Sequence, residues 1–320
     1  MARRLDEQSG FVSLSFAIVY ASRVDILADE LAQARARGAV FSVLGRQAPW
    51  GLQFSGTRPL TAHLLLKGNG WIELPDADPV PLRAHDVVLV TAGTPYRLVS
   101  AVGVPAEPIA EARSVGSETD ADAVILCGAY VLEGSIGDSL LRALPRIAVV
   151  ESDQLAPRHA AAISLLAAEA SSEGPGQQAL LDRLLDLNLV YTLRAWWSRP
   201  DAEPPGWYRA GADSNLSRVL QAVHADPAKP WSVTTMAQLA GMSRAAFSAH
   251  FTAVVGQPPA RYLTALRMRR AEDALTRTNA PLSRIATAVG YRNEYAFATA
   301  FRRHHNTPPA RWRREALRRT

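Results

Sequence analysis

The chain has 320 residues, of which 48% are hydrophobic, and a formal net charge of +5. This length predicts about two domains, and the composition supports real hydrophobic cores, which excludes a wholly disordered protein. No apolar run approaches the roughly 20 residues that a membrane span needs, and the N-terminus lacks a signal-peptide pattern, so we expect no membrane association. The single cysteine, Cys127, excludes an intramolecular disulfide and fits a reducing cytoplasm.

The charge is unevenly distributed along the chain. Residues 211–320 hold 17 of the 35 Lys and Arg residues but 6 of the 30 Asp and Glu residues, which gives this segment +11 and leaves −6 for residues 1–210. A basic segment on an acidic body indicates a polyanionic partner, although a merely solvated basic surface is the alternative. The preference for arginine favours DNA, because a guanidinium fork suits both phosphates and guanine edges.

The first half of the chain predicts a short helix followed by a β-structure. Residues 25–38 have the pattern of an amphipathic helix. Short apolar runs separated by Gly, Pro, Asp and Asn then predict the strands of a small barrel or jelly roll, at 39–45, 52–55, 61–66, 70–74, 86–92, 96–100 and 123–131. The Gly-rich stretch 67–70 predicts a hairpin turn between its flanking strands, and 101–120, rich in Pro, Glu and Ser, predicts a loop.

Two helices and a linker are predicted next. The helices lie between about 155 and 197 and are separated by a Gly-Pro break at 174–176. The second helix, 176–197, is apolar over more than one stripe, so one stripe can cover the barrel while another pairs with a second subunit. Packing within the monomer alone is the alternative. The Pro/Gly-rich stretch beginning at 198 predicts an interdomain linker, placed at 198–212.

An internal repeat marks the basic segment. Two stretches, beginning at Ser232 and Pro281, match at an offset of 49 up to a glycine and at an offset of 50 after it. Each contains an apolar stripe, then Gly241 or Gly290, then a pair of phenylalanines four residues apart. Glycine allows the left-handed conformation that ends a helix, and an aromatic pair at this spacing buries one helix face. Each copy therefore predicts a helix-turn-helix unit whose second helix has one exposed face, with the phenylalanines in the core.

A single long helix is predicted between the two units. Residues 259–278 contain no internal Gly or Pro, so they predict a rod of roughly 30 Å, close to the roughly 34 Å turn of B-DNA. Such a rod can hold two recognition helices in successive major grooves, and it can equally be an amphipathic core helix. We expect Tyr262, Leu263 and Leu266 to face the core, and Arg267, Arg269 and Arg270 to face outward.

The motifs AGMSRAAFSAHF, VGQPPARYL, IATAVGY, AFATAFRR and TPPARWRR, in this order, resemble the AraC/XylS-type DNA-binding domain over residues 213–317. The resemblance implies helix-turn-helix units at about 233–255 and 282–305, with recognition helices at about 243–255 and 294–305. It implies that bases are read by Arg244, Ala245, Ser248, Ala249, Asn293, Glu294, Tyr295, Ala298 and Thr299.

One position departs from the family pattern. Many members carry a long polar or basic side chain where this chain has Ala249, which can touch a thymine methyl group but cannot hydrogen-bond a base edge. We therefore expect first-unit specificity to rest on Arg244 and Ser248, and Ser243 to cap the helix. We expect the phosphate contacts, for which simple solvation is the alternative, to come from Arg302, Arg303, Arg311, Arg313 and Arg314. His304 and His305 are expected to be surface or cap residues near a helix end.

The N-terminal segment 20–150 resembles the cupin-like sensor domain of many AraC-type regulators, through HLLLKGNGWIEL, RAHDVVLVTAGTPYRL and ILCGAYV. The fold class is then α+β with two domains: a cupin-like β-barrel with trailing helices in 1–197, and an all-α domain of two helix-turn-helix units joined by a long helix. Cupin enzymes hold a metal through an HxH pair and a later histidine, but here Leu65 lies two residues after His63, and Tyr96 takes the later position. We expect no metal or cofactor, with His63 in the core or in a pocket and Cys127 a buried, unreactive thiol.

These features predict a DNA-binding transcription regulator that is not an enzyme. The resemblance implies a ligand-responsive activator whose partners are double-stranded promoter DNA, a small-molecule effector of unknown identity, a second copy of the chain through helix 176–197, and RNA polymerase. One alternative is a cupin-type metalloenzyme with a DNA-binding appendage. Another is a protein that packages nucleic acid without sequence preference.

Overall fold

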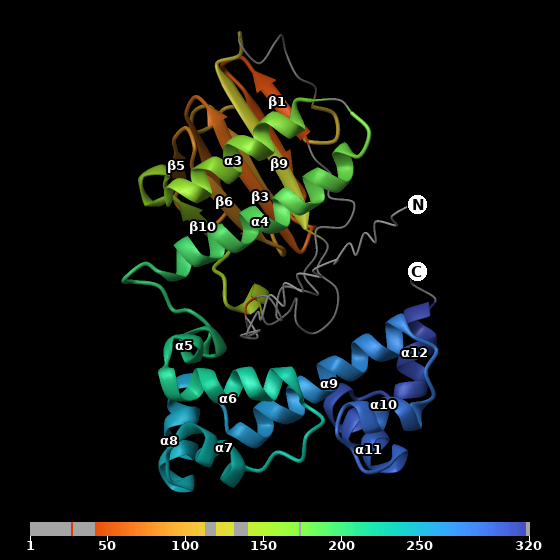
Figure 1. Ribbon diagram of the computed structural model, residues 1–320. Helices are drawn as coiled ribbons and strands as arrows, with labels where there is room; N and C mark the ends of the chain where they lie inside the picture. The colour runs from red at the N-terminus through yellow and green to blue at the C-terminus, as the bar shows by residue number, and fades with distance from the viewer. Residues whose placement is uncertain (1–26, 28–41, 113–119, 131–139, 173, 318–320) are drawn as a thin grey trace, which may run out of the picture.

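The computed structural model describes residues 27, 42–112, 120–130, 140–172 and 174–317, which form a β-rich domain and a helical domain (Figure 1). The helix predicted over 25–38 lies outside the described residues, except for Leu27, which is buried. Among the described residues, no helix combines the length and the apolar character that crossing a membrane requires.

The β-rich domain consists of two five-stranded sheets. The first sheet has the order β1-β9-β3-β6-β10, with β1 (Ser42–Arg46), β9 (Ala123–Tyr130), β3 (Leu60–Lys67), β6 (Val87–Thr91) and β10 (Ile147–Val150). The second has the order β5-β4-β7-β2-β8, with β5 (Val80–Leu82), β4 (Gly70–Glu73), β7 (Tyr96–Val99), β2 (Gly51–Phe54) and β8 (Glu107–Pro108). The cupin-like domain is thus a pair of facing sheets that remain separate within the described residues. The sequence did not predict β5, β8 or β10, and β8 lies inside the predicted loop 101–120.

The predicted hairpin at 67–70 is wrong. β3 pairs with β6 and β9 in the first sheet, whereas β4 pairs with β5 and β7 in the second. The Gly-Asn-Gly stretch therefore carries the chain from one sheet to the other. A glycine-rich turn permits either path, and the partners of a buried strand are chosen by contacts distant in sequence.

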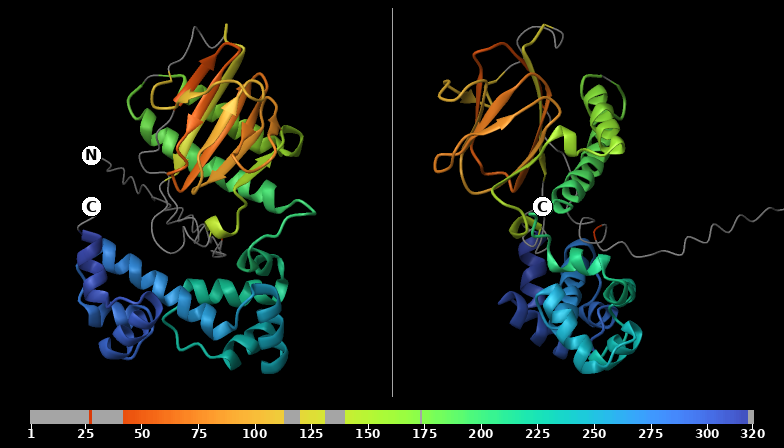
Figure 2. Two further views of the ribbon diagram at one scale, coloured as in Figure 1. Left: turned by 180° about the vertical axis from the view of Figure 1, so that it is seen from behind. Right: turned by 90° about the vertical axis from the view of Figure 1, so that its left-hand side faces the viewer.

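The first sheet is buried on both faces, as the alternation along β3 shows. Leu60, Ala62 and Leu64 belong to the core shared with the trailing helices, whereas Leu65 belongs to the core between the two sheets. Those helices are α3 (Pro157–Ala170) and α4 (Gln177–Trp197), and Figure 2 shows them as a third layer against this sheet. Gly176 immediately precedes α4, which confirms the predicted break between the two helices.

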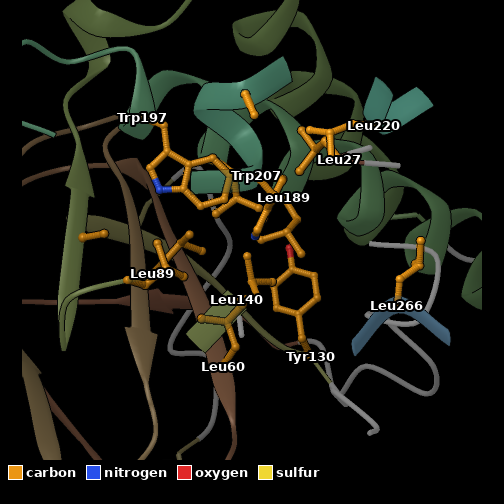
Figure 3. Packing of buried hydrophobic residues seen from close by; sticks show 14 of the residues in the cluster. Leu27, Leu60, Leu89, Tyr130, Leu140, Leu189, Trp197, Trp207, Leu220 and Leu266 are labelled. Carbon is orange, nitrogen blue, oxygen red and sulfur yellow. The ribbon is translucent and has the colours of Figure 1, made fainter. Parts of the chain in front are cut away.

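The stretch predicted as a linker contains a helix, α5 (Gly206–Ala212). Its Trp207 is 8% exposed and packs edge-on against Trp197 at the end of α4, with ring centroids 5.7 Å apart (Figure 3). The sequence did not predict α5, because its Pro-rich surroundings have low helix propensity. The helix is stabilised instead by burial of its aromatic side chains.

The helical domain has the two predicted units. The first is formed by α7 (Val233–Ala240) and α8 (Arg244–Val255), and the second by α10 (Leu282–Ala288) and α11 (Glu294–His305). The sequence did not predict α6 (Ser214–Ala225), which packs against α7, or α12 (Pro309–Leu317), which packs against α11. Each unit is defined to include its additional helix. The long helix α9 (Pro259–Arg277) joins them, and α8 and α11 lie near its opposite ends (Figure 1). Tyr262, Leu263 and Leu266 are buried, as predicted.

Candidate nucleic-acid interface

The first helix-turn-helix unit is built by local capping. Ser232 forms a capping box with Thr235 at the start of α7, and Gly241 ends that helix with φ of 69°. Ser243 then caps α8, because its hydroxyl accepts a hydrogen bond from the Ala246 amide at 3.2 Å. The expected capping role of Ser243 is confirmed, and the next residue, Arg244, begins the exposed first turn of α8.

The second unit repeats this construction with different residues. Gly290 adopts a φ of 81° after α10. Asn293, which is equivalent to Ser243, caps α11 by accepting a hydrogen bond from the Ala296 amide at 2.8 Å. The side-chain oxygen of Asn293 therefore accepts the capping hydrogen bond, and its amide nitrogen can donate a hydrogen bond to a base.

Paired aromatic residues anchor both recognition helices. Phe247 and Phe251 have ring centroids 5.5 Å apart, and Phe297 and Phe301 have centroids 5.6 Å apart. All four side chains are at most 1% exposed. They are core residues, as predicted, and the opposite faces of α8 and α11 are turned away from each core.

The predicted base-reading residues gather on the first turns and outer faces of these two helices. Ser248 and Ala298 are half-buried, and the exposed ones are Arg244, Ala245, Ala249, Asn293, Glu294, Tyr295 and Thr299. Tyr295 is 83% exposed, which is unusual for a large aromatic side chain. Glu294, at the first position of α11, also has a structural role available, since a carboxylate stabilises a helix N-terminus.

The predicted phosphate-binding arginines fall into two groups. Arg302, Arg303 and Arg314 are exposed. Arg311 is exposed too, but its Nε donates to Glu315 at 2.7 Å, and the half-buried Arg313 donates to the Ala280 carbonyl at 2.7 Å. Arg313 therefore holds α12 against the end of the loop before α10, so a contact with DNA would compete with this role.

Of the two positions expected for His305, the one at the surface is wrong, although the residue does lie at the end of α11. The centroid of its ring lies 4.3 Å from that of Phe301 and 4.8 Å from that of Trp312, with the rings tilted. Its Nε2 lies 3.0 Å from a Glu272 carboxylate oxygen. The helix end is covered by α12, so a histidine there packs inside. His304 is exposed, as expected.

The prediction that Arg267 faces outward is also wrong. Arg267 is half-buried, and its guanidinium donates to the carbonyls of Pro227 and Lys229. Arg267 lies four residues after the core residue Leu263, on the same face of α9, and this spacing was the signal that could have placed it inward.

Comparison with known proteins identifies both domains. The family model described as a cupin matches residues 25–198, more than half of the chain, and a helix-turn-helix domain model matches residues 236–315. The chain belongs to the AraC-type transcription regulators that carry an N-terminal cupin domain.

Relatives of this AraC-type regulator extend over most of its length. A Streptomyces lividans protein described as AraC-like is 28% identical over 91% of this chain and 98% of its own length. The regulator AlkR of Acinetobacter baylyi is 26% identical over 84% of this chain and 92% of its own. The activator RclR of Escherichia coli, named as RCS-specific, is 29% identical over 78% of this chain and 83% of its own.

Similar solved structures include the DNA-binding domain of AdpA in complex with a target DNA. The two share 27% sequence identity with a TM-score of 0.32, and the match extends over 33% of this chain and 95% of the AdpA domain. Fatty-acid-bound ToxT from Vibrio cholerae shares 12% identity with this chain at a TM-score of 0.36, and the match extends over 87% of this chain and 96% of ToxT.

In the cupin domain of this AraC-type regulator, His63 lies in a buried polar chain. Its Nε2 is 2.7 Å from the Tyr96 hydroxyl, and its Nδ1 is 3.2 Å from the Cys127 sulfur. Burial lowers the pKa of His63 to about 3 and raises the pKa of the Cys127 thiol to about 12. Both groups are therefore neutral near pH 7, and Cys127 lacks the thiolate character of a reactive cysteine.

Both ring nitrogens of His63 thus have protein partners. Within the described ranges, no three His, Cys, Asp or Glu side chains cluster as metal ligands would. A small cavity between the sheets adjoins His63 and is lined mainly by apolar side chains, among them Trp50, Leu65, Val88 and Ile125.

Proposed function

We propose that this regulator binds double-stranded promoter DNA in a sequence-specific manner, with α8 and α11 in successive major grooves. The observation that carries the proposal is the pair of capped, exposed recognition helices held by one rod. The 19 residues of α9 span roughly 28 Å, close to the roughly 34 Å that separates successive major-groove segments on one face of B-DNA. Exposed side chains of α8 and α11 would read bases, and Arg302 and Arg303 would hold phosphates.

We further propose that the cupin domain makes DNA binding responsive to a small molecule. The support is a continuous path of contacts from α4 to the first recognition helix. Trp197 at the end of α4 packs on Trp207 and Tyr208 of α5, with ring centroids 5.7 Å and 4.7 Å apart. A ligand that moved α4 would therefore move α5.

α5 in turn contacts the end of α8. Arg209 donates to the Val254 carbonyl at 3.0 Å. Gly206 lies so close to the Val255 carbonyl that a Cβ atom at Gly206 would collide with it. Beyond α5, Asp213 meets His250 of α8, with 2.7 Å between the carboxylate and Nε2. A displacement of α5 would thus reorient α8 relative to DNA.

A homodimer through helix 176–197 and a role as an activator complete the proposal. Leu180 and Leu187 on the outer face of α4 are 52% and 40% exposed, and Leu165 on α3 is 55% exposed. Exposed apolar side chains on these two helices favour a partner surface, and a second copy would cover them without any additional component. The name of the relative RclR supports activation, which would make RNA polymerase a further partner in the cytoplasm.

The test of DNA binding is selection from a random duplex pool followed by footprinting. The expected result is one enriched motif and a protected site that covers two adjacent major grooves. Enrichment of no motif, with uniform binding to every duplex, would overturn sequence-specific recognition and favour nucleic-acid packaging.

The ligand-response proposal is tested by a metabolite screen against promoter-driven reporter output. A response that the wild type shows and Trp207→Ala loses, with DNA binding retained, is expected if α5 transmits the signal. Absence of any responsive compound in a broad screen would count against ligand control. Sedimentation of wild type against Leu187→Asp tests the dimer, which is expected to weaken in the variant.

A further inference from the structure

The two helix-turn-helix units are joined by α9 but have separate hydrophobic cores. Leu263 and Leu266 belong to the core of the first unit, whereas Met268 and Ala271 belong to the core of the second. α9 passes from one core to the other at residue 267. Long helices are rarely straight. The helix α9, held by a separate core at each end, therefore does not by itself fix the angle between the two units.

Arg267 links the two units at this junction. Its Nε donates to the Pro227 carbonyl at 2.8 Å and its Nη2 to the Lys229 carbonyl at 2.9 Å. Both carbonyls lie in the loop between α6 and α7, in the first unit. The guanidinium carbon also lies 5.9 Å from the ring centroid of Tyr291, in the turn between α10 and α11 of the second unit.

The loop that receives Arg267 is braced from within. The Asp226 carboxylate accepts hydrogen bonds from the amides of Ala228 and Lys229, both at 3.1 Å. The Trp231 indole donates to the Asp226 carbonyl at 2.8 Å. The two carbonyls that accept from Arg267 are therefore held in place, which suits the rigid fork of a guanidinium group.

A close approach at Gly290 gives independent evidence that the two units meet here. A Cβ atom at Gly290 would lie 2.7 Å from Arg267 Nη2 and 2.8 Å from the Ala228 carbonyl oxygen. Gly241 occupies the equivalent position in the first unit, and a Cβ atom there would meet nothing within 4 Å. The turn of the second unit thus lies directly on Arg267 and on the loop of the first, whereas the turn of the first unit is open.

We propose that Arg267 is a positioning residue that sets the rotation and distance between α8 and α11, and thereby the spacing at which two DNA elements are read. This inference rests on the proposed two-groove function. Lysine cannot replace this arginine fully, because an ammonium group lacks the planar fork with which Arg267 donates to two carbonyls while lying over the Tyr291 ring.

The first test needs no DNA. Spin labels are attached to the full chain at Ala249→Cys and Thr299→Cys, one exposed position on each recognition helix, with the unmodified chain as the control for labelling of Cys127. We expect a narrow distance distribution in the otherwise wild-type chain and a broader or shifted one with Arg267→Ala. Arg277→Ala, which removes an exposed arginine from the same helix, is expected to leave the distribution narrow. An unchanged distribution with Arg267→Ala would overturn the inference.

The second test uses duplexes carrying the motif selected by the wild type, with one or two base pairs inserted between its two protected halves. Each inserted pair rotates one half by roughly 34° relative to the other. We expect the wild type to lose at least about tenfold in affinity per insertion, and Arg267→Ala to lose less than about threefold, from a weaker starting affinity.

Arg267→Lys, which keeps the charge, should be intermediate, and it serves in both tests if Arg267→Ala does not fold. If the Arg267 variants weaken all spacings by the same factor, Arg267 contributes charge or stability only, and the inference is wrong. If the wild type itself is indifferent to spacing, the proposed two-groove function fails, and the spin-label distances still decide whether Arg267 fixes the two helices.

Discussion

In the first unit, α8 ends in Val254 and Val255, which α5 covers, whereas the equivalent positions of α11 in the second unit are His304 and His305, next to α12. Phe247 and Phe297 are equally buried. Phe251 and Phe301 each make an edge-to-face contact, with ring centroids 5.7 Å from Tyr262 and 5.8 Å from Trp312. The repeat is therefore maintained where side chains are buried. It has diverged where each unit meets a different neighbour.

The exposed faces differ as much as the helix ends. The first unit offers Arg244 among alanines, whereas the second offers Asn293, Glu294 and the exposed Tyr295. One scaffold used twice thus presents two different surfaces, as expected if each unit reads its own DNA element. Four sets of variants test this comparison.

The largest effect is expected from the phenylalanine cores. Phe297→Ala should reduce the free energy of unfolding by roughly 3–5 kcal/mol, measured by urea denaturation, because it leaves a cavity in a small core. The core of the second unit is separate from that of the first. The second half of the footprint should therefore disappear while the first half persists, and loss of both halves together would show that the units do not behave separately. Phe297→Leu, which fills more of the space, should be milder.

Base reading is the next largest effect. Arg244→Ala and Tyr295→Ala should each relax the base preference at one position of their own half-site, by about 1–3 kcal/mol, as measured by selection from random duplexes. Because Tyr295 is 83% exposed, the stability of its variant should remain within roughly 0.5 kcal/mol of wild type. If a variant selects the same motif as the wild type, the residue that it replaces does not read a base.

The two caps should separate stability from recognition. Ser243→Ala and Asn293→Ala should each lose about 1 kcal/mol of stability, because each removes an acceptor from a helix N-terminus. Asn293→Asp keeps the acceptor and removes the amide nitrogen, so it should retain the stability while changing the base preference. If Asn293→Asp selects an unchanged motif, Asn293 is a cap alone.

The smallest effect concerns phosphate contacts. Arg302 of the second unit is equivalent to Thr252 of the first, whose hydroxyl donates to the Ser248 carbonyl within α8. Arg302→Ala should weaken binding to all sequences by a few-fold and reduce the slope of affinity against salt by about 1. Thr252→Ala is the matched control and should leave the slope unchanged. An equal change in both variants would argue against a phosphate contact by Arg302.

Patterns local in sequence predicted most of the DNA-binding domain. The long helix predicted over 259–278, the cap at Ser243 and the buried phenylalanine pairs follow from spacing and residue type, because each depends on neighbours within one or two helical turns. The same reasoning failed for His305 and Arg267. Both side chains meet partners far along the chain, Glu272 for the first and the loop 226–229 for the second.

The β-rich domain shows the same limit more strongly. Seven of its ten described strands could be predicted from short apolar runs, whereas β5, β8 and β10 could not. The path from β3 to β4 was misread as a hairpin, since strand partners come from distant parts of the sequence. Helix α5 was missed because its aromatic residues are stabilised by Trp197 rather than by their own neighbours.

The amino-acid sequence by itself determined the two domains, the repeated units and the buried face of each recognition helix, because periodicity, capping and turn chemistry act over short distances. Only the tertiary structure decided which sheet each strand joins, how α5 connects the cupin domain to α8, and that Arg267 and Gly290 bring the two units together. These arrangements depend on close packing between segments that are far apart in the chain, and no local pattern encodes the distance between them.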